Sequence, residues 1–469
     1  TLNSDSNEFS SIIIGGTVTG NISYNRYVNS VGTNEWDLIG APVSGQSINS
    51  FVTANTSTLA TNGATKAIGY YNNTDNTWTN YTTSTIVGAG NFPLGKGFQM
   101  ATNANGTGIL SFTGAPTATN QTWTIIDNDA ANSGAGTRWN LVANPFPSYI
   151  YGNANADSSH NFLTVNSDKL NDSYEAIYGY DADGSGYTVY NNTSAALRLA
   201  PGQAFMVASD NAENDTISFT TAMRTTTGGD DLIVGRDPID SFELVLKLYE
   251  GDSEIDHTKF YFGDGLSLNL DPGYDAGHFN QGASLMSRLV EEDEGVGLVI
   301  NAMGLESVND VVAPLELNIE AGNNFRISIG TFNIDTAINV YLEDNVQETM
   351  TLLNDQDFEL TAENELSGVG RFFIHLTETV LSIDDKIETN YLNVFKADVN
   401  NFITVEGLAN QSNGTKLRLY TIRGKEVTFT TLNNTNNKQT ISTQGLSTGI
   451  YIVKLESGNI LHTKKLFIK

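Results

Sequence analysis

Apolar and polar residues alternate along much of this chain, in short runs that turn-forming residues separate. Residues 242–249 read Phe-Glu-Leu-Val-Leu-Lys-Leu-Tyr, with an apolar side chain at every second position, as in a strand with one buried face. Comparable apolar runs occupy residues 258–262, 297–301, 315–319, 325–329, 338–342 and 370–376. Strands at this spacing predict an antiparallel β-sandwich. Residues 283–292 fit either a short helix or a loop.

The first half of the chain nearly repeats itself, which predicts two β-rich units in tandem. Residues 35–42 match residues 138–145, each a Trp-containing strand that ends in a Pro turn. An aromatic hairpin follows, at residues 67–81 in the first unit and 176–190 in the second, with no gap in the alignment. A Gly–aromatic strand and a Phe strand complete each unit, at residues 97–100 and 110–113 and at residues 204–207 and 217–220.

The end of the chain contains seven short apolar runs between residues 392 and 468, which fit a small immunoglobulin-like sandwich. The last two runs, 450–456 and 460–468, are rich in β-branched and aromatic residues. Ser457-Gly458-Asn459 joins them, and Gly and Asn tolerate the positive φ of a tight turn.

These patterns predict an all-β fold in five segments, because no long helical pattern with capping residues interrupts the strands. The segments are N-terminal strands that end an upstream region (1–33), repeat unit 1 (34–135), repeat unit 2 (136–228), an acidic β-sandwich (229–382) and a C-terminal domain (383–469).

Charge is distributed unevenly along these segments. The formal net charge of −29 argues against nucleic-acid binding, since phosphates require a basic face. Residues 229–384 contain 6 basic and 31 acidic side chains, whereas residues 385–469 contain 11 basic and 6 acidic ones. This change of sign indicates separate modules. Acidity that keeps a secreted surface soluble explains the middle segment but not the positive end.

Three motifs in the C-terminal domain occur in a fixed order. They are Leu-Arg-Leu-Tyr-Thr-Ile-Arg-Gly-Lys-Glu-Val at 417–427, Leu-Ser-Thr-Gly-Ile-Tyr-Ile-Val-Lys at 446–454, and the basic–apolar end Lys-Lys-Leu-Phe-Ile-Lys at 464–469. Together they resemble the type A C-terminal sorting domain of proteins that the type IX secretion system of Bacteroidetes exports. The resemblance covers about residues 383–469.

The resemblance implies an export signal that is recognised in its folded form. The implied partners are the type IX translocon, an outer-membrane shuttle barrel and a surface sortase. The sortase would cut within residues 381–388 and join the passenger to lipopolysaccharide. The implied location is the cell surface or the extracellular space. The residues implied in sorting are Gly424, Gly449, Tyr451, Lys454, Lys464, Lys465 and Lys469. The alternative interpretation of these lysines is a solvated edge strand protected against aggregation.

The sequence offers little support for catalysis, so we expect no enzyme in this chain. There is no cysteine, hence no thiol nucleophile, thiolate metal site or disulfide. No His-Glu-x-x-His motif, no Gly-x-Ser-x-Gly elbow between a strand and a helix, and no phosphate-binding glycine loop before a helix is present. The sequence does not exclude a pair of carboxylates that cleaves glycosides, because carboxylates are abundant and the distance between them depends on the fold. The five histidines are His160, His257, His278, His375 and His462.

One loop offers possible ligands for calcium. Asp181, Asp183 and Ser185 place oxygen atoms at alternate positions, as in the first half of a calcium loop. Asn192 stands where the bidentate glutamate is expected, so a plain hairpin turn is the favoured interpretation. No other cofactor is expected.

The aromatic hairpins offer a second possible site. Exposed rings on a sheet face could stack on sugars or form an adhesive surface, whereas cross-strand pairing is the favoured interpretation. The candidate stacking residues are Tyr71, Trp78, Tyr81, Tyr180, Tyr187 and Tyr190.

The combined prediction is the C-terminal part of a secreted surface protein that acts as a non-enzymatic adhesin or stalk, for example in gliding motility. The chain starts at Thr1, shows no signal peptide and contains no apolar run long enough to span a bilayer. We therefore expect it to be a processed or truncated piece of a larger protein. The alternatives are the C-terminal part of a secreted hydrolase with an upstream catalytic domain, and a carbohydrate-binding module.

Overall fold

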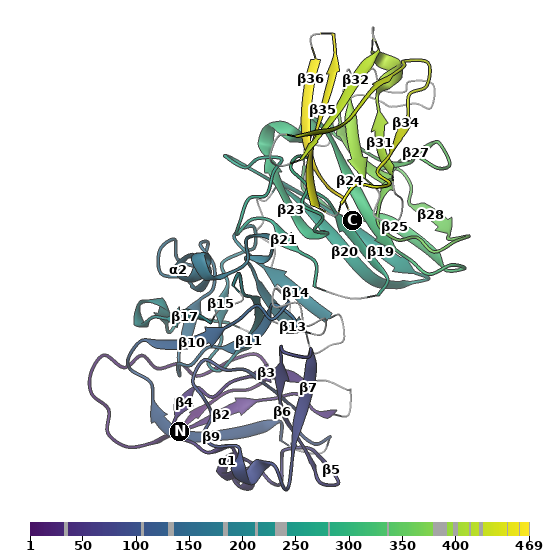
Figure 1. Ribbon diagram of the computed structural model, residues 1–469. Coiled ribbons are helices and arrows are strands. Elements are labelled where there is room, and N and C mark those ends of the chain that lie inside the picture. The colour runs from purple at the N-terminus through teal and green to yellow at the C-terminus, as the bar shows by residue number, and fades with distance from the viewer. Residues whose placement is uncertain are drawn as a thin grey trace. The chain divides into compact units, whose positions relative to one another are not determined.

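The computed structural model divides the chain into two compact units, Thr1–Ile239 and Asp240–Lys469 (Figure 1). The structure describes residues 1–31, 36–104, 107–129, 136–181, 186–211, 214–229, 242–279, 282–334, 337–378, 392–396, 402–411, 414–421, 425–447, 449–458 and 460–468. Strands dominate both units and the helices are short, which confirms the all-β prediction. No helix within these ranges has the length and apolar character needed to cross a membrane.

The first lobe of unit 1 packs two sheets and a short helix around one core. Helix α1 (Ile48–Ala54) begins after Ser47, whose hydroxyl accepts a hydrogen bond from the Ser50 N–H. A 3₁₀ turn, η2, covers Ile86–Gly88. The strands are β1 (Leu2–Asn3), β2 (Ile22–Tyr27), β3 (Asp37–Ile39), β4 (Val43–Ser44), β5 (Thr61–Asn62), β6 (Thr65–Asn72), β7 (Thr77–Thr82), β8 (Phe98–Met100) and β9 (Ile109–Pro116).

The second lobe of unit 1 has its own core and a second short helix, α2 (Phe162–Asn166), which Asn161 caps through the Thr164 N–H. Its 3₁₀ turns are η3 (Ser167–Lys169), η4 (Asp172–Tyr174) and η5 (Thr221–Met223). Its strands are β10 (Gln121–Ile125), β11 (Trp139–Ala143), β12 (Tyr149–Tyr151), β13 (Ile177–Asp181), β14 (Gly186–Tyr190), β15 (Arg198–Leu199), β16 (Ala204–Ala208), β17 (Asp215–Phe219) and β18 (Arg224–Thr225).

The sequence repeat is also a repeat of strand pairing. In the first lobe β8 lies between β3 and β6, and β7 pairs with β6; in the second lobe β16, β11, β13 and β14 hold the corresponding places. The register is also conserved, because Ile39 opposes Phe98 just as Val142 opposes Phe205.

Each repeat also includes a strand that the sequence did not assign to it. β2 pairs antiparallel with β9, and β10 pairs antiparallel with β17 in the corresponding place. Tyr24 and Val28, from the segment that the sequence set apart as 1–33, lie in the first core, and Ile125 lies in the second. Strands were predicted within residues 1–33 but assigned to an upstream region, and β10 was not predicted. The side chains of β2 and β10 do not repeat, although their hydrogen-bonding roles do.

Unit 2 begins with a β-sandwich, here called the sandwich (residues 242–378), in which the strands form one continuous sheet in the order β27-β26-β29-β24-β22-β23-β20-β19-β25-β28. Leu244 of β19 and Phe372 of β29 share one core, so the sheet folds over on itself. The strands are β19 (Phe242–Glu250), β20 (Ser253–Gly263), β21 (Ala276–Gly277), β22 (Ser284–Ser287), β23 (Leu298–Gly304), β24 (Asp310–Asn318), β25 (Asn324–Phe332), β26 (Asn339–Asp344), β27 (Thr349–Leu352), β28 (Phe358–Thr361) and β29 (Val369–Thr377), with η6 at Leu305–Asn309.

Two details of the sandwich differ from the prediction. β20 and β23 are parallel, whereas only antiparallel strands were expected. β22 lies within residues 283–292, where a helix or a loop was predicted. All four residues of β22 are buried, including Ser284 and Ser287, so the alternation that marks a half-exposed strand is absent.

The C-terminal segment, here called the tail domain (residues 392–468), contains all seven predicted strands in two sheets, β30-β31-β34 and β33-β32-β35-β36. Side chains from both sheets form a core of their own, which includes Val394, Leu417 and Val453. The strands are β30 (Asn393–Lys396), β31 (Phe402–Glu406), β32 (Thr415–Thr421), β33 (Glu426–Leu432), β34 (Gln439–Ser442), β35 (Gly449–Ser457) and β36 (Ile460–Ile468), with η7 at Leu408–Asn410.

Candidate functional site

The terminal hairpin of the tail domain, β35 and β36, contains five of the seven residues predicted to act in sorting (Figure 1). The two strands pair without a bulge from Gly449 opposite Ile468 to Ser457 opposite Ile460. β36 is the last strand of its sheet, so its outer backbone edge has no strand partner within the described ranges. Such an edge carries unpaired N–H and C=O groups that can accept an added strand.

The predicted sorting residues occupy different environments. Tyr451 is buried in the tail core, and its hydroxyl donates a hydrogen bond to the Ser447 carbonyl at 2.8 Å. Lys454 is exposed, with its ammonium 5.7 Å from the centre of the Tyr420 ring. Gly449 opens β35, and Lys465 pairs with Ile452 in the ladder. Gly424 and Lys469 lie outside the described residues, as does the predicted cleavage region 381–388.

Lys464 is buried, although an exposed basic strand was expected, and only 4% of its surface is accessible. Burial lowers its pKa, while the nearby carboxylates of Asp293 and Glu291 raise it and the Arg288 guanidinium lowers it. All three neighbours belong to the sandwich. Lys464 therefore faces the acidic part of its own unit, which sequence spacing could not have shown.

The outer face of the sheet β33-β32-β35-β36 combines basic and aromatic side chains. The guanidinium of Arg418 lies 4.6 Å from the ring centre of Phe429, which is 51% exposed. Glu426 pairs with Arg418 at 2.9 Å, and Glu456 pairs with Lys416 at 3.5 Å. No sequence pattern directly indicated this face, which side chains of β32 and β33 form.

The aromatic hairpins of unit 1 are largely paired within themselves. Tyr71 and Trp78 oppose each other with ring centres 5.2 Å apart, and Tyr180 and Tyr187 do so at 5.3 Å. Burial raises the pKa of Tyr187, and Tyr180 and Tyr71 raise it further, so the two hairpins lie within electrostatic reach of one another. Trp78 is 37% exposed.

The remaining aromatic candidates are less accessible than Trp78. Tyr81 is half-buried, with its ring 5.5 Å from that of Tyr70, and Tyr190 is buried in the second core. A flat ligand could therefore reach Trp78 far more easily than these tyrosines.

Two of the three predicted calcium ligands, Asp183 and Ser185, lie outside the described residues, and of Asp181 only the backbone, at the end of β13, is described. Across the described ranges, no group of three or more His, Asp or Glu side chains is arranged to hold a metal ion.

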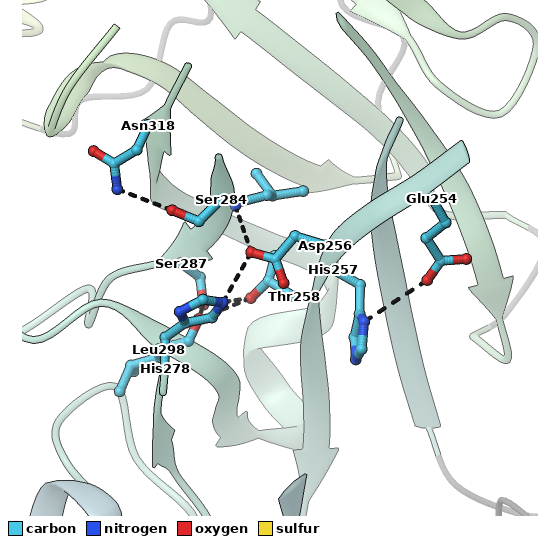
Figure 2. A network of polar contacts seen from close by, with 10 residues as sticks. Glu254, Asp256, His257, Thr258, His278, Ser284, Ser287, Leu298 and Asn318 are labelled. Atoms are coloured by element: carbon cyan, nitrogen blue, oxygen red, sulfur yellow. Dashed lines mark hydrogen bonds and ion pairs between the residues drawn. The ribbon is translucent and has the colours of Figure 1, made fainter. Parts of the chain in front are cut away.

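A buried acid–histidine pair lies inside the sandwich (Figure 2). His278 Nε2 is 2.8 Å from Asp256 Oδ2, and the two side chains are 4% and 5% exposed. The same carboxylate oxygen accepts the Leu285 N–H at 2.8 Å, which ties β22 to β20. Beside it, Thr258 Oγ1 lies 3.1 Å from Ser287 Oγ and 3.0 Å from the Leu298 carbonyl.

This network has the residue types of a hydrolase site but not the access. A general base must reach the proton that it removes from a substrate. Here the polar groups are buried and hydrogen-bonded, in part to backbone groups, so Asp256 links β20 to β22. The sequence indicated no role for His278, because its partner is 22 positions away and only the fold brings the two residues together. His257 points away from the pair, toward Glu254 (Figure 2).

Two regions of the chain match known families. Residues 9–375 match the family described as Domain of unknown function (DUF8693), and residues 397–469 match the Secretion system C-terminal sorting domain. No curated protein matches the chain. Among solved structures, a crystal structure of the adhesin domain of Epf from Streptococcus pyogenes is similar at 12% identity and a TM-score of 0.14. That match covers 34% of this chain and 76% of the other.

The sorting-domain match contains all three motifs at 417–427, 446–454 and 464–469 and confirms the resemblance. The chain is a cargo of the type IX secretion system of Bacteroidetes, exported across the outer membrane to the cell surface or the extracellular space. Since the first match spans most of its length, the chain belongs to the DUF8693 family and ends in a secretion system C-terminal sorting domain.

Proposed function

We propose that this type IX cargo acts at the cell surface as a non-enzymatic adhesin or stalk, with the tail domain as its export and sorting signal. The observation that supports adhesion is the exposed Trp78 on the β6–β7 hairpin of a rigid duplicated scaffold. An aromatic side chain held on a regular strand is suited to binding, because little conformational entropy is lost on contact.

Backbone contacts between the two lobes supply that rigidity. The Gly40 N–H donates to the Gly202 carbonyl at 2.8 Å, and the Ala143 N–H donates to the Gly95 carbonyl at 2.9 Å. In the repeat, Gly40 corresponds to Ala143 and Gly95 to Gly202, so one contact is made twice. Two equivalent backbone hydrogen bonds between the lobes resist rotation of one lobe against the other.

In this proposal the open edge of β36 and the outward lysines of the tail domain engage the translocon and the shuttle barrel. The surface sortase then cuts within residues 381–388 and attaches the passenger to lipopolysaccharide. Adhesion in gliding motility is one setting in which such a passenger would serve.

Deletion of Gly449–Lys469 tests the sorting role. The deletion removes β35 and β36, and we expect the protein to accumulate in the periplasm, as measured by protease accessibility on whole cells and by fractionation. A full-length Trp78→Ala variant is the control and should reach the surface. Normal surface display of the deletion would refute the assigned role.

Binding assays on the displayed protein test adhesion. We expect Trp78→Ala to lower binding of cells to glycan-coated or abiotic surfaces at least several-fold, because it removes an exposed ring. Val87→Ala is the matched control, since Val87 is an exposed apolar residue of the same lobe. Unchanged binding by Trp78→Ala would remove the role of this hairpin.

A carbohydrate-binding module is the second candidate, supported by the same exposed ring. Hits on a glycan array that disappear with Trp78→Ala would favour this candidate over general adhesion. Hydrolysis of polysaccharide or peptide substrates by the purified chain would overturn the non-enzymatic assignment.

A further inference from the structure

One aromatic side chain of the sandwich points out of its sheet yet is hidden from solvent. Phe372 and Ile374 of β29 face the sandwich core. Phe373 lies between them in sequence and therefore projects from the opposite face. Only 1% of Phe373 is exposed, so something outside the sandwich core covers it.

The tail domain supplies the cover. Val394 of β30 faces the tail core, and Phe395, the next residue, projects away from that core. Phe395 is 4% exposed, and its ring centre lies 5.0 Å from that of Phe373 in an edge-to-face arrangement. Each ring thus buries the other, and separation of the tail domain from the sandwich would expose both to water.

Polar and apolar contacts surround this ring pair. The Asn345 side-chain amide, in the sandwich, donates to the Glu406 carboxylate of the tail domain at 3.0 Å. Pro314 and Val369 of the sandwich line a cavity together with Lys464 and Leu466 of β36. These contacts and the Phe373–Phe395 pair are here called the tail–sandwich interface.

The charges of the two parts are complementary. Residues 229–384 contain 31 acidic and 6 basic side chains, and residues 385–469 contain 11 basic and 6 acidic ones. Lys464 is buried at the interface, where the charges of Asp293 and Glu291 favour its ammonium and that of Arg288 opposes it. An apolar centre with a charged rim is the usual anatomy of a specific protein interface.

We propose that the tail domain is a docked partner of its own sandwich and stays bound through the tail–sandwich interface when the chain between them is cut. Lys464 is buried in this docked state, and an acidic external partner meets Lys454 and the outer face of the sheet instead. This inference does not depend on the proposed adhesion.

A protease site inserted within residues 381–388 of the full chain tests the proposal. After complete cleavage, the two fragments of the wild type should co-elute in size-exclusion chromatography at low micromolar concentration. We expect Phe373→Ala and Phe395→Ala each to raise the dissociation constant of the cleaved complex at least tenfold, so that the fragments separate. Phe429→Ala is the matched control, since this exposed ring belongs to the same domain but not to the interface.

The two variants protect the test against misfolding. Phe373→Ala leaves the tail domain unchanged, and Phe395→Ala leaves the sandwich unchanged, so a folding defect in one does not affect the other. Separation of the cleaved wild-type fragments would overturn the proposal. So would co-elution of both cleaved variants with unchanged affinity. Weakened binding in either alanine variant, with Phe429→Ala intact, supports it.

Discussion

Single residues decide how closely the repeated lobes approach each other. A Cβ on Gly40 would lie 2.3 Å from Ala143 Cβ and 2.7 Å from the Lys96 carbonyl oxygen, closer than atoms can pack. Gly40 is therefore required by the approach of two backbones rather than by a turn. Its counterpart in the second lobe is an alanine, so the pseudo-symmetry ends at this pair of side chains.

Gly40→Ala should destabilise unit 1 by about 1–3 kcal/mol, because a methyl group is forced into a closed contact. Urea unfolding followed by circular dichroism measures the change. Gly88→Ala is the matched control, since a Cβ at Gly88 meets nothing within 4 Å. Equal effects of the two substitutions would contradict the close approach.

Glu175 makes the stability of unit 1 depend on pH. Burial raises the pKa of its carboxyl group from 4.5 to about 7, and the charge of Asp172 adds to the rise. Between these two values the unfolded chain has lost the proton while the folded chain still holds it. The unfolded state then binds fewer protons, so the free energy of unfolding falls as pH rises through this window and is level above it.

Glu175→Gln should remove this decline, which amounts to about 3 kcal/mol across the window. Urea unfolding at pH 4.5 and at pH 8 should show a smaller difference between the two pH values in the variant than in the wild type. Glu8→Gln is the exposed control and should follow the wild type. An identical pH dependence in Glu175→Gln would exclude this group as the cause.

At the scale of elements, the side chain of one asparagine hydrogen-bonds each short helix to a strand of its own lobe. The Asn55 amide donates to the Phe51 and Ser111 carbonyls, and its oxygen accepts the Ser111 N–H. Asn166 makes the equivalent contacts with Phe162 and Ser218. One side chain thus ends α1 or α2 and bonds it to β9 or β17.

Asn55→Ala and Asn166→Ala should each destabilise unit 1 by about 1–3 kcal/mol, because buried backbone groups lose their partners. Thermal or urea unfolding measures both. Asn103→Ala is the control, since the hydrogen bond from its side chain to the Ser57 carbonyl is exposed. If only one of the two substitutions lowered the free energy of unfolding, the two lobes would not share this stabilising interaction.

Elements were predictable where their side chains alternate and hidden where they do not. All seven tail strands follow a visible alternation, since one face of each lies on the tail core. β22 has no polar face, so alternation gave no signal for it. β2 was predicted as an N-terminal strand but not as part of the repeat, and β10 was not predicted, because the two strands share no side-chain pattern. The Asp256–His278 pair could not be predicted for a related reason, because strand pairing sets its geometry.

At the scale of the whole molecule, the chain forms two units whose cores do not share residues. Among the described residues, the two largest cores of Thr1–Ile239 and the two of Asp240–Lys469 are formed separately. A unit with a complete core is expected to fold by itself.

Each unit expressed alone should therefore unfold cooperatively. Calorimetry of Thr1–Ile239 and of Asp240–Lys469 should give transitions whose sum reproduces the full chain, with each midpoint within a few degrees of its value there. The full chain serves as the reference. An unfolded isolated unit, seen by far-UV circular dichroism, would contradict the independence of the cores.

The sequence by itself determined the all-β class, the tandem repeat, the seven tail strands and the sorting signal, since each depends on local alternation or on a motif within one segment. The tertiary structure decided which distant residues meet. It showed that β2 and β10 belong to the repeats, that Asp256 and His278 form a buried pair, and that Lys464 faces the acidic sandwich. The physical reason is that burial and pairing depend on contacts between segments far apart in the chain, and those contacts leave no periodic trace in either segment.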